Sequence, residues 1–195
     1  MSIDIATPLL PYRITICGLS ELPHHADAGF SHVISILDPA WPDPQDFARY
    51  GAHRRVIWRF DDVVEVGQGY TEPSAGNVRA ILELGRELLE ETSAQLLVHC
   101  HAGVSRSTAT AVILMVQPNP GRERDAFAEL ASIRPRSWPN ALMVGMADEM
   151  LGRGGELTAA LRDHQRRVAR AYPDFADLLA RCGRAHEIEG LDEAY

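Results

Sequence analysis

The sequence contains no lysine, so all 19 of its basic residues are arginines. Schiff-base chemistry on a lysine and phosphate binding by a lysine ammonium are therefore excluded. Acidic residues outnumber basic ones, and the formal net charge of −8 argues against binding to nucleic acid or to an anionic membrane through a basic surface. With 195 residues, of which 46% are hydrophobic, the chain can bury one sizeable core, and we expect a single domain over residues 1–195.

Cysteine is also scarce, with three residues at widely separated positions, Cys17, Cys100 and Cys182. An odd and scattered set does not indicate a disulfide framework. We find no leader segment and no apolar run of about 18 residues that would span a membrane. These features lead us to expect a protein of the reducing cytoplasm.

Residues 99–108 (HCHAGVSRST) are the most informative stretch of the chain. The apolar residues 95–98 before it predict a buried strand, and residues 107–115 after it predict a buried helix. A loop from Cys100 to Arg106 would present successive backbone N–H groups and a helix N-terminus to its concave side, and both favour a bound anion such as phosphate. The same field favours the thiolate form of Cys100, which would make this residue a nucleophile.

Other residues of the loop suit phosphate chemistry. Arg106 can offer a planar fork of donors to two phosphate oxygens, a geometry that a lysine would not reproduce. Gly103 can permit a sharp turn and a close approach of the backbone to the ligand. The hydroxyl of Ser107 is placed to donate to the Cys100 sulfur and to stabilise it as a leaving group.

Two simpler interpretations of Cys100 account for less of the pattern. An inert buried thiol, which is a common role for cysteine, would leave Gly103, Arg106 and the helix start unexplained. A metal site made of His99, Cys100 and His101 is disfavoured, because adjacent loop positions point in different directions and no second ligand pair has the usual spacing. We therefore expect no metal.

The pattern His99-Cys100-x5-Arg106-Ser107 resembles the signature of the cysteine-dependent protein tyrosine phosphatase superfamily. Residues 102–107 (AGVSRS) are most similar to its dual-specificity branch. Residues 60–63 (FDDV), the loop and residues 138–140 (WPN) are also similar to a bacterial group of predicted tyrosine phosphatase-like proteins. The resemblance extends from about residue 33 to residue 151.

This resemblance implies a phosphatase fold, a phosphocysteine intermediate and no cofactor. It also implies that His99 organises the loop through a ring nitrogen, and we expect His101 at the rim of the pocket. The positions expected to bind phosphate are His101, Ala102, Gly103, Val104, Ser105 and Arg106.

Transfer of phosphate to sulfur also requires an acid that protonates the departing oxygen. The candidates are Asp61 and Asp62, which follow an apolar strand at residues 56–60. Neighbouring side chains on an extended segment face opposite sides, so one of the two should face the site and the other should face away. The resemblance to the bacterial group favours Asp62, with Asp61 as the alternative, and two solvated loop carboxylates are the simpler interpretation.

Asn140 ends the segment 134–140 (RPRSWPN). A Pro-Asn pair before residues 141–143 is a good helix N-cap. In the dual-specificity phosphatases, such a pair lies near the start of a late helix, and its asparagine amide fixes the backbone of the phosphate loop. The two roles are compatible, and either would make Asn140 structural.

The remaining pattern predicts an α/β fold with a central, mostly parallel sheet of about four to five strands flanked by helices. Further strands are expected at residues 12–17 and 32–37, and the apolar spacing over residues 74–91 predicts a helix that returns the chain to the strand before Cys100. Later helices are expected at residues 122–133, 140–151 and 156–171. We expect a catalytic core at about residues 12–151 and a helical C-terminal extension at residues 152–195.

Together these features predict a protein phosphatase that hydrolyses phosphotyrosine in a protein or peptide partner, with phosphoserine and phosphothreonine as further candidate substrates. A singly phosphorylated residue suits the loop better than a polyphosphate does, because the loop contains no lysine. Two alternatives stay open. One is a phosphate-binding module that recognises phosphorylated partners without turnover, and the other is a phosphatase of inositol phosphates or lipids.

Overall fold

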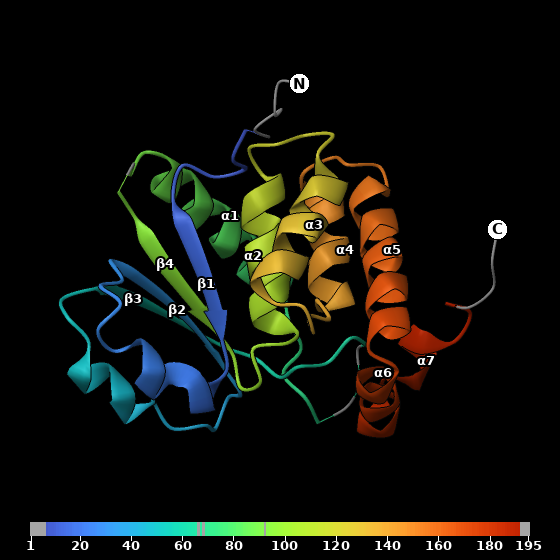
Figure 1. Cartoon of the computed structure of the whole chain (residues 1–195), viewed down its shortest axis with the longest axis horizontal. Helices are drawn as coiled ribbons and strands as arrows, with labels where there is room; N and C mark the ends of the chain where they lie inside the picture. The colour runs from blue at the N-terminus through green and yellow to red at the C-terminus, as the bar shows by residue number, and fades with distance from the viewer. Residues whose placement is uncertain (1–6, 66, 68, 92, 192–195) are drawn as a thin grey trace.

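A computed structural model describes residues 7–65, 67, 69–91 and 93–191, so both ends of the predicted domain lie outside the described residues. Its centre is a sheet of four parallel strands in the spatial order β1-β4-β2-β3 (Figure 1). The α/β fold with a mostly parallel sheet is therefore confirmed. The strands are β1 (Arg13–Cys17), β2 (His32–Leu37), β3 (Arg54–Arg59) and β4 (Gln95–His99).

The side chains of each strand alternate between the two faces of the sheet, and this alternation divides the core into two layers. In β4, Leu96 and Val98 pack into the main core on the helical face of the sheet, whereas Leu97 packs into a smaller core on the other face. Successive side chains of a strand point to opposite faces, so His99 and Cys100 at the end of β4 are also sent to opposite sides. Cys100 lies in the main core, on the helical face.

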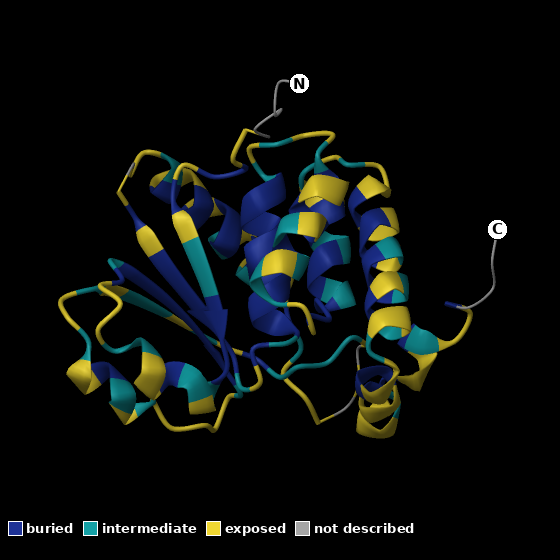
Figure 2. Ribbon diagram, viewed as in Figure 1, coloured by how far each residue is buried: buried dark blue, intermediate teal, exposed yellow. Residues whose placement is uncertain are grey.

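The predicted helices are present close to their expected bounds. The α1 helix (Ala75–Leu89) connects β3 to β4, and α2 (Arg106–Val116) follows the Cys100 loop as a fully buried helix. Around α2 pack α3 (Glu123–Ile133) and α4 (Ala141–Met150), and α5 (Glu156–Ala171) packs on α3 and α4. The exposed residues of α3 and α5 lie on their outer sides in Figure 2. Burial of apolar stripes at helical spacing explains why these helices were readable in the sequence.

Several short helices were not predicted. Two 3-10 helices, η1 (Leu19–His25) and η2 (Gln45–Arg49), supply Leu22 and Phe47 to the smaller core. After α5 the chain continues through α6 (Pro173–Leu179), a π-helical turn η3 (Ala180–Arg184) and α7 (Ala185–Ile188). Short helices of this kind carry too few turns for an apolar period to show in the sequence.

The C-terminal extension packs on Trp138, which is completely buried. Val168 of α5, Phe175 and Leu179 of α6, and Leu191 surround this indole. Trp138 lies just before α4, so the cluster fastens the extension to the chain segment that leads into Asn140. No helix among the described residues has the length and apolar character needed to cross a membrane.

Two buried histidines make the stability of this fold sensitive to acid. His164 in α5 is fully buried, and its Nε2 lies 3.0 Å from the Ser137 hydroxyl oxygen. Burial lowers the pKa of His164, and that of His99, from 6.5 to about 4. Between these pH values the unfolded chain binds more protons than the folded one, so the free energy of unfolding falls as the pH drops from 6.5 to 4.

We predict that His164→Gln flattens this pH dependence. The variant should lose stability at pH 7 through altered packing, yet its further loss between pH 6.5 and 4 should be about 3 kcal/mol smaller than that of the wild type. Urea unfolding at a series of pH values measures both quantities. Exposed His24→Gln is the control and should keep the wild-type slope. An unchanged slope in His164→Gln would contradict the prediction.

Candidate active site

The Cys100 loop joins β4 to α2 at the carboxyl edge of the sheet, as predicted. Every carbonyl oxygen from residue 101 to residue 105 accepts a hydrogen bond from a group outside the loop. The donors are the N–H groups of Leu19, Trp138, Asn140 and Ala109, the guanidinium of Arg134 and the hydroxyl of Thr108. The C=O and the following N–H of a trans peptide point in opposite directions, so the N–H groups of residues 102–106 turn to the inside of the loop. None of them donates to another described residue.

Gly103 and Gly18 allow the loop to cross the end of β1. Gly103 has a φ of +68°, and a Cβ at this position would lie 2.5 Å from the carbonyl carbon of Cys17. A Cβ on Gly18 would lie 2.9 Å from the carbonyl carbon of Ala102. The sharp turn predicted at Gly103 is present, but the close approach is to the backbone of the protein itself.

The Cys100 sulfur lies 3.2 Å from the Ser107 hydroxyl oxygen. Both residues are almost fully buried. This distance is within hydrogen-bond range for sulfur, so Ser107 is where the sequence prediction puts it. Cys17 lies in the other core, and burial raises the pKa of its thiol to about 12, so it stays protonated.

Arg106 is buried at the start of α2 and is held by two acceptors. Its Nη1 donates to a carboxylate oxygen of Asp38 at 2.7 Å and to the carbonyl of Phe60 at 2.6 Å. Its Nε has no hydrogen-bond partner among the described residues, although the side chain is only 3% exposed. Buried donors are nearly always satisfied, so this Nε is suited to an anion that enters the loop.

Asp38 is a site residue that the sequence analysis missed. It follows β2, which is hydrogen-bonded to β4, so the two strands end at the same edge of the sheet. Its backbone N–H donates to Nε2 of His101 at 3.2 Å, which requires an unprotonated ring nitrogen. Burial lowers the pKa of His101, in agreement with this bond. The His101 ring also packs against Trp41, with ring centroids 4.6 Å apart, at the partly exposed rim.

Of the two candidate acids, Asp62 faces the Cys100 loop and Asp61 faces away. The Asp62 Oδ1 accepts a hydrogen bond from the Ser105 hydroxyl at 2.6 Å, and its Oδ2 lies 3.9 Å from the Nε of Arg106. The Asp61 carboxylate instead accepts the backbone N–H of Thr71 at 2.7 Å. The expectation that the two carboxylates point in opposite directions agrees with this geometry.

Asn140 caps α4 and supports the site, but its side-chain amide does not reach the loop backbone. Its Oδ1 accepts the N–H of Met143 at 3.1 Å, which is the predicted N-cap bond. Its Nδ2 donates to Asp62 at 3.1 Å and to the carbonyl of Val63 at 2.9 Å. Its backbone N–H is the group that reaches the carbonyl of Ser105. The amide thus holds the segment that carries the candidate acid.

His99 connects β4 to β2. Its Nε2 lies 2.7 Å from the hydroxyl oxygen of Ser35, and its ring packs near Phe47 at 5.5 Å between centroids. Because its pKa is about 4, the ring is neutral at pH 7. The sequence analysis expected a ring nitrogen to organise the loop, whereas this contact fixes the strand from which the loop begins.

A pair of residues that the sequence did not reveal, Arg134 and Glu21, clamps the outside of the loop. Arg134 donates to the carbonyls of Ala102 and Gly103, each at 3.1 Å, and forms two 2.7 Å bonds with the Glu21 carboxylate. Glu21 also accepts the N–H of Gly18 at 2.7 Å. The bonds with Arg134 hold the pKa of Glu21 below its usual value, so the clamp stays charged at neutral pH.

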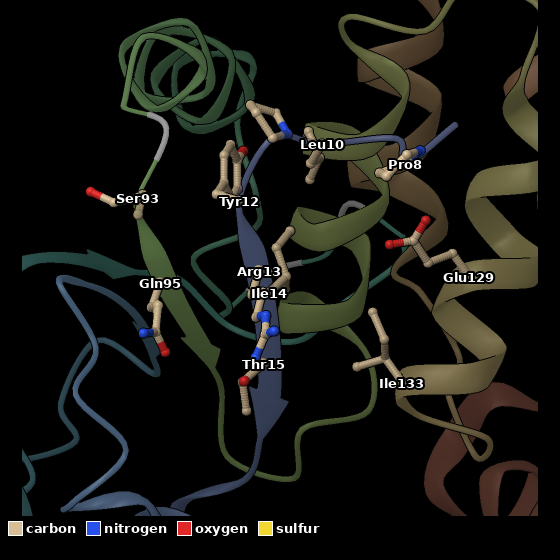
Figure 3. Close-up of a pocket in the computed structure, with 12 residues that line it drawn as sticks. Pro8, Leu10, Tyr12, Arg13, Ile14, Thr15, Ser93, Gln95, Glu129 and Ile133 are labelled. Carbon is tan, nitrogen blue, oxygen red and sulfur yellow. The ribbon is translucent and has the colours of Figure 1, made fainter. Parts of the chain in front are cut away.

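Two of the cavities in the described structure lie in different regions of the molecule. One of about 410 Å³ lies between the Asp62 segment and the extension, with Tyr70 and Arg184 among its lining residues. Another, of about 620 Å³, lies along edge strand β1 beside Glu129 and Ile133 of α3 (Figure 3). The second cavity shares no residue with the Cys100 loop. The described residues contain no cluster of three or more His, Cys, Asp or Glu side chains arranged to hold a metal ion.

We predict that Gly103→Ala destabilises the protein more than Gly121→Ala does. Both glycines have a positive φ, which costs roughly 1–2 kcal/mol for alanine. Only Gly103 is crowded, and the clash with the β1 backbone should add about 1–3 kcal/mol, whereas a Cβ on Gly121 meets nothing within 4 Å. Chemical unfolding of both variants measures the difference. Equal losses of stability in the two variants would show that the close crossing of the loop over β1 does not limit the size of residue 103.

Comparison with known proteins identifies the fold. No family model and no curated protein matches the sequence. Tk-PTP in its active form superposes with a TM-score of 0.53 at 20% identity, over 72% of this chain and 92% of that chain. A human tyrosine phosphatase-like serine/threonine/tyrosine-interacting protein gives 0.54 at 24% identity, over 74% and 93% of the two chains. PTPMT1 in complex with PI(5)P gives 0.53 at 13% identity, over 78% and 96%.

These likenesses confirm the fold that the resemblance of the loop sequence implies. At such identities they establish architecture and leave the reaction and the substrate to be argued from the site. The chain has the fold of the cysteine-dependent tyrosine and dual-specificity phosphatases.

Proposed function

We propose that this protein is a phosphatase that hydrolyses phosphotyrosine, and also phosphoserine or phosphothreonine, in proteins or peptides through a phosphocysteine intermediate. The observation that carries the proposal is the outward anchoring of every loop carbonyl from 101 to 105. It leaves a set of inward N–H groups in the loop that begins with Cys100. The buried, unpartnered Nε of Arg106 adds a charged donor for a phosphate oxygen.

The first chemical step is attack of the Cys100 thiolate on phosphorus. The S–P bond forms while the bond from phosphorus to the leaving oxygen breaks, and Asp62 gives its proton to that oxygen. Charge on the equatorial oxygens is stabilised by Arg106 and the loop N–H groups. The loop and Arg106 already have this arrangement without substrate, so little reorganisation of the site is needed when substrate binds.

The second step hydrolyses the phosphocysteine. Water attacks phosphorus, Asp62 accepts its proton, and the S–P bond breaks to return the Cys100 thiolate and inorganic phosphate. The Ser107 hydroxyl, 3.2 Å from the sulfur, donates to the departing thiolate. The reaction balances without a metal or a cofactor.

A phosphate-binding module without turnover is the second candidate, and one observation favours it. The guanidinium of Arg184 lies 2.6 Å from Oδ1 of Asp62, so the candidate acid is paired with a cation in this structure. This ion pair gives Asp62 a structural role that does not require turnover. Turnover measurements separate the two candidates.

We predict that the protein hydrolyses p-nitrophenyl phosphate in the presence of a chelator and that Cys100→Ser abolishes this activity. The serine hydroxyl is far less ionised than a thiol, so the nucleophile is lost while the loop is kept. A phosphotyrosine and phosphothreonine peptide panel then defines the substrate. Phosphopeptide binding without turnover would favour the module, and release of phosphate from inositol polyphosphates alone would favour the lipid and inositol phosphate alternative.

A second prediction concerns the acid. Asp62→Asn should lower turnover of phosphopeptides by roughly 10²–10⁴-fold and remove the basic limb of the pH–rate profile, because a positioned acid contributes about this factor. Asp61→Asn is the matched control and should keep that limb, since its carboxylate bonds Thr71. If Asp62→Asn keeps the limb and Asp61→Asn loses it, the assignment is reversed.

A further inference from the structure

The C-terminal extension contributes a buried arginine to the active site. Arg184 ends the π-helical turn η3 and is only 8% exposed. It lies well beyond residues 33–151, the stretch that carries the family resemblance. Nothing in the chemistry of phosphate binding or nucleophilic attack described above requires it.

Arg184 binds the candidate acid and the phosphate loop at the same time. Its Nη2 donates to Oδ1 of Asp62 at 2.6 Å and lies 2.9 Å from the Ser105 hydroxyl oxygen. Ser105 itself donates to the same Oδ1 at 2.6 Å. The three side chains come from the extension, the segment after β3 and the loop before α2, so a single contact point joins three parts of the chain.

The other side of the guanidinium is anchored in the extension. Nη1 of Arg184 donates to a carboxylate oxygen of Glu187 at 3.2 Å, and Glu187 is 4% exposed. The same carboxylate accepts the indole N–H of Trp138 at 3.2 Å and the amide of Gln165 at 3.3 Å. Arg184 is therefore fixed from behind by buried partners, and its position does not depend on a flexible surface side chain.

These contacts give the two oxygens of Asp62 different roles. Oδ1 receives three donors, from Ser105, Asn140 and Arg184. Oδ2 receives no hydrogen bond from a described residue and lies 3.9 Å from the Nε of Arg106. A carboxyl held by one oxygen from three directions cannot rotate freely, so the oxygen left for proton transfer is the one that faces Arg106.

We propose that Arg184 is a positioning residue for the reaction: it fixes the Asp62 carboxyl so that Oδ2 delivers the proton to the leaving oxygen. The inference rests on the proposed phosphatase function. It assigns a catalytic purpose to the extension, which supplies one of the three donors on the acid. An arginine suits this task because its Nη1 and Nη2 reach two different carboxylates, Glu187 and Asp62, whereas a lysine has one nitrogen.

The test compares two substrates that differ in their need for an acid. Phenyl phosphate has a poor leaving group and depends on protonation, whereas p-nitrophenyl phosphate has a good one and depends on it less. Arg184→Met should lower kcat on phenyl phosphate about 10–100-fold and should lower kcat on p-nitrophenyl phosphate by a clearly smaller factor. Arg184→Lys, which retains one donor, should recover part of the loss on phenyl phosphate.

A matched control removes a different arginine that ties the same extension to the core. Arg136 pairs with Asp174 of α6 at 3.0 Å, and both side chains are exposed. Arg136→Met should leave kcat on both substrates unchanged. Thermal unfolding of each variant confirms that it is folded at the assay temperature.

Three outcomes would overturn the proposal. Equal losses on both substrates would indicate a general structural role, and a gain in turnover would indicate that Arg184 restrains the acid. A further loss on phenyl phosphate when Arg184→Met is added to Asp62→Asn would show that Arg184 acts independently of the carboxyl. If the wild type turns over neither substrate, the phosphatase function fails as well, whereas Cys100-dependent turnover with any of these three results refutes the role of Arg184 alone.

Discussion

The hydrogen bonds that turn the loop carbonyls outward are the constraint on which the site depends. A buried carbonyl without a partner is costly, so the donors on the outside of the loop hold its shape even without a ligand. These donors come from the start of η1, from α2 and from the segment between α3 and α4. Glu21 fixes Arg134, which donates to two of the loop carbonyls. The inward direction of the loop N–H groups is a consequence of bonds made outside the loop.

The parallel sheet explains why the candidate site residues meet. The strands β2, β3 and β4 end at the same edge, and each is followed directly by a polar site residue or loop. Asp38 follows β2, Asp62 lies shortly after β3, and Cys100 follows β4. Side chains placed at the carboxyl ends of neighbouring parallel strands converge without any long-range signal in the sequence. Alternation along β4 then places Cys100 on the helical face.

The sequence was sufficient to predict the features that depend on residues close to one another in the chain. The strands, the long helices, the Cys100–Ser107 pair and the opposite directions of Asp61 and Asp62 follow from periodicity and from chain neighbours. Asp38 has a usable signal, since a polar residue that directly follows a buried strand lies at the carboxyl edge of the sheet. Arg134, Glu21 and Arg184 had none, because each acts through contacts with segments distant in sequence.

The contact between Arg184 and Asp62 spans 122 residues of chain. A closure of this length cannot form until residue 184 has left the ribosome, and contacts of large sequence separation slow folding. The strands and the loop can assemble earlier, from residues that emerge first. During synthesis, Cys100 and the segment that carries Asp62 thus leave the ribosome before Arg184, so the candidate acid gains this restraint only after the extension has emerged.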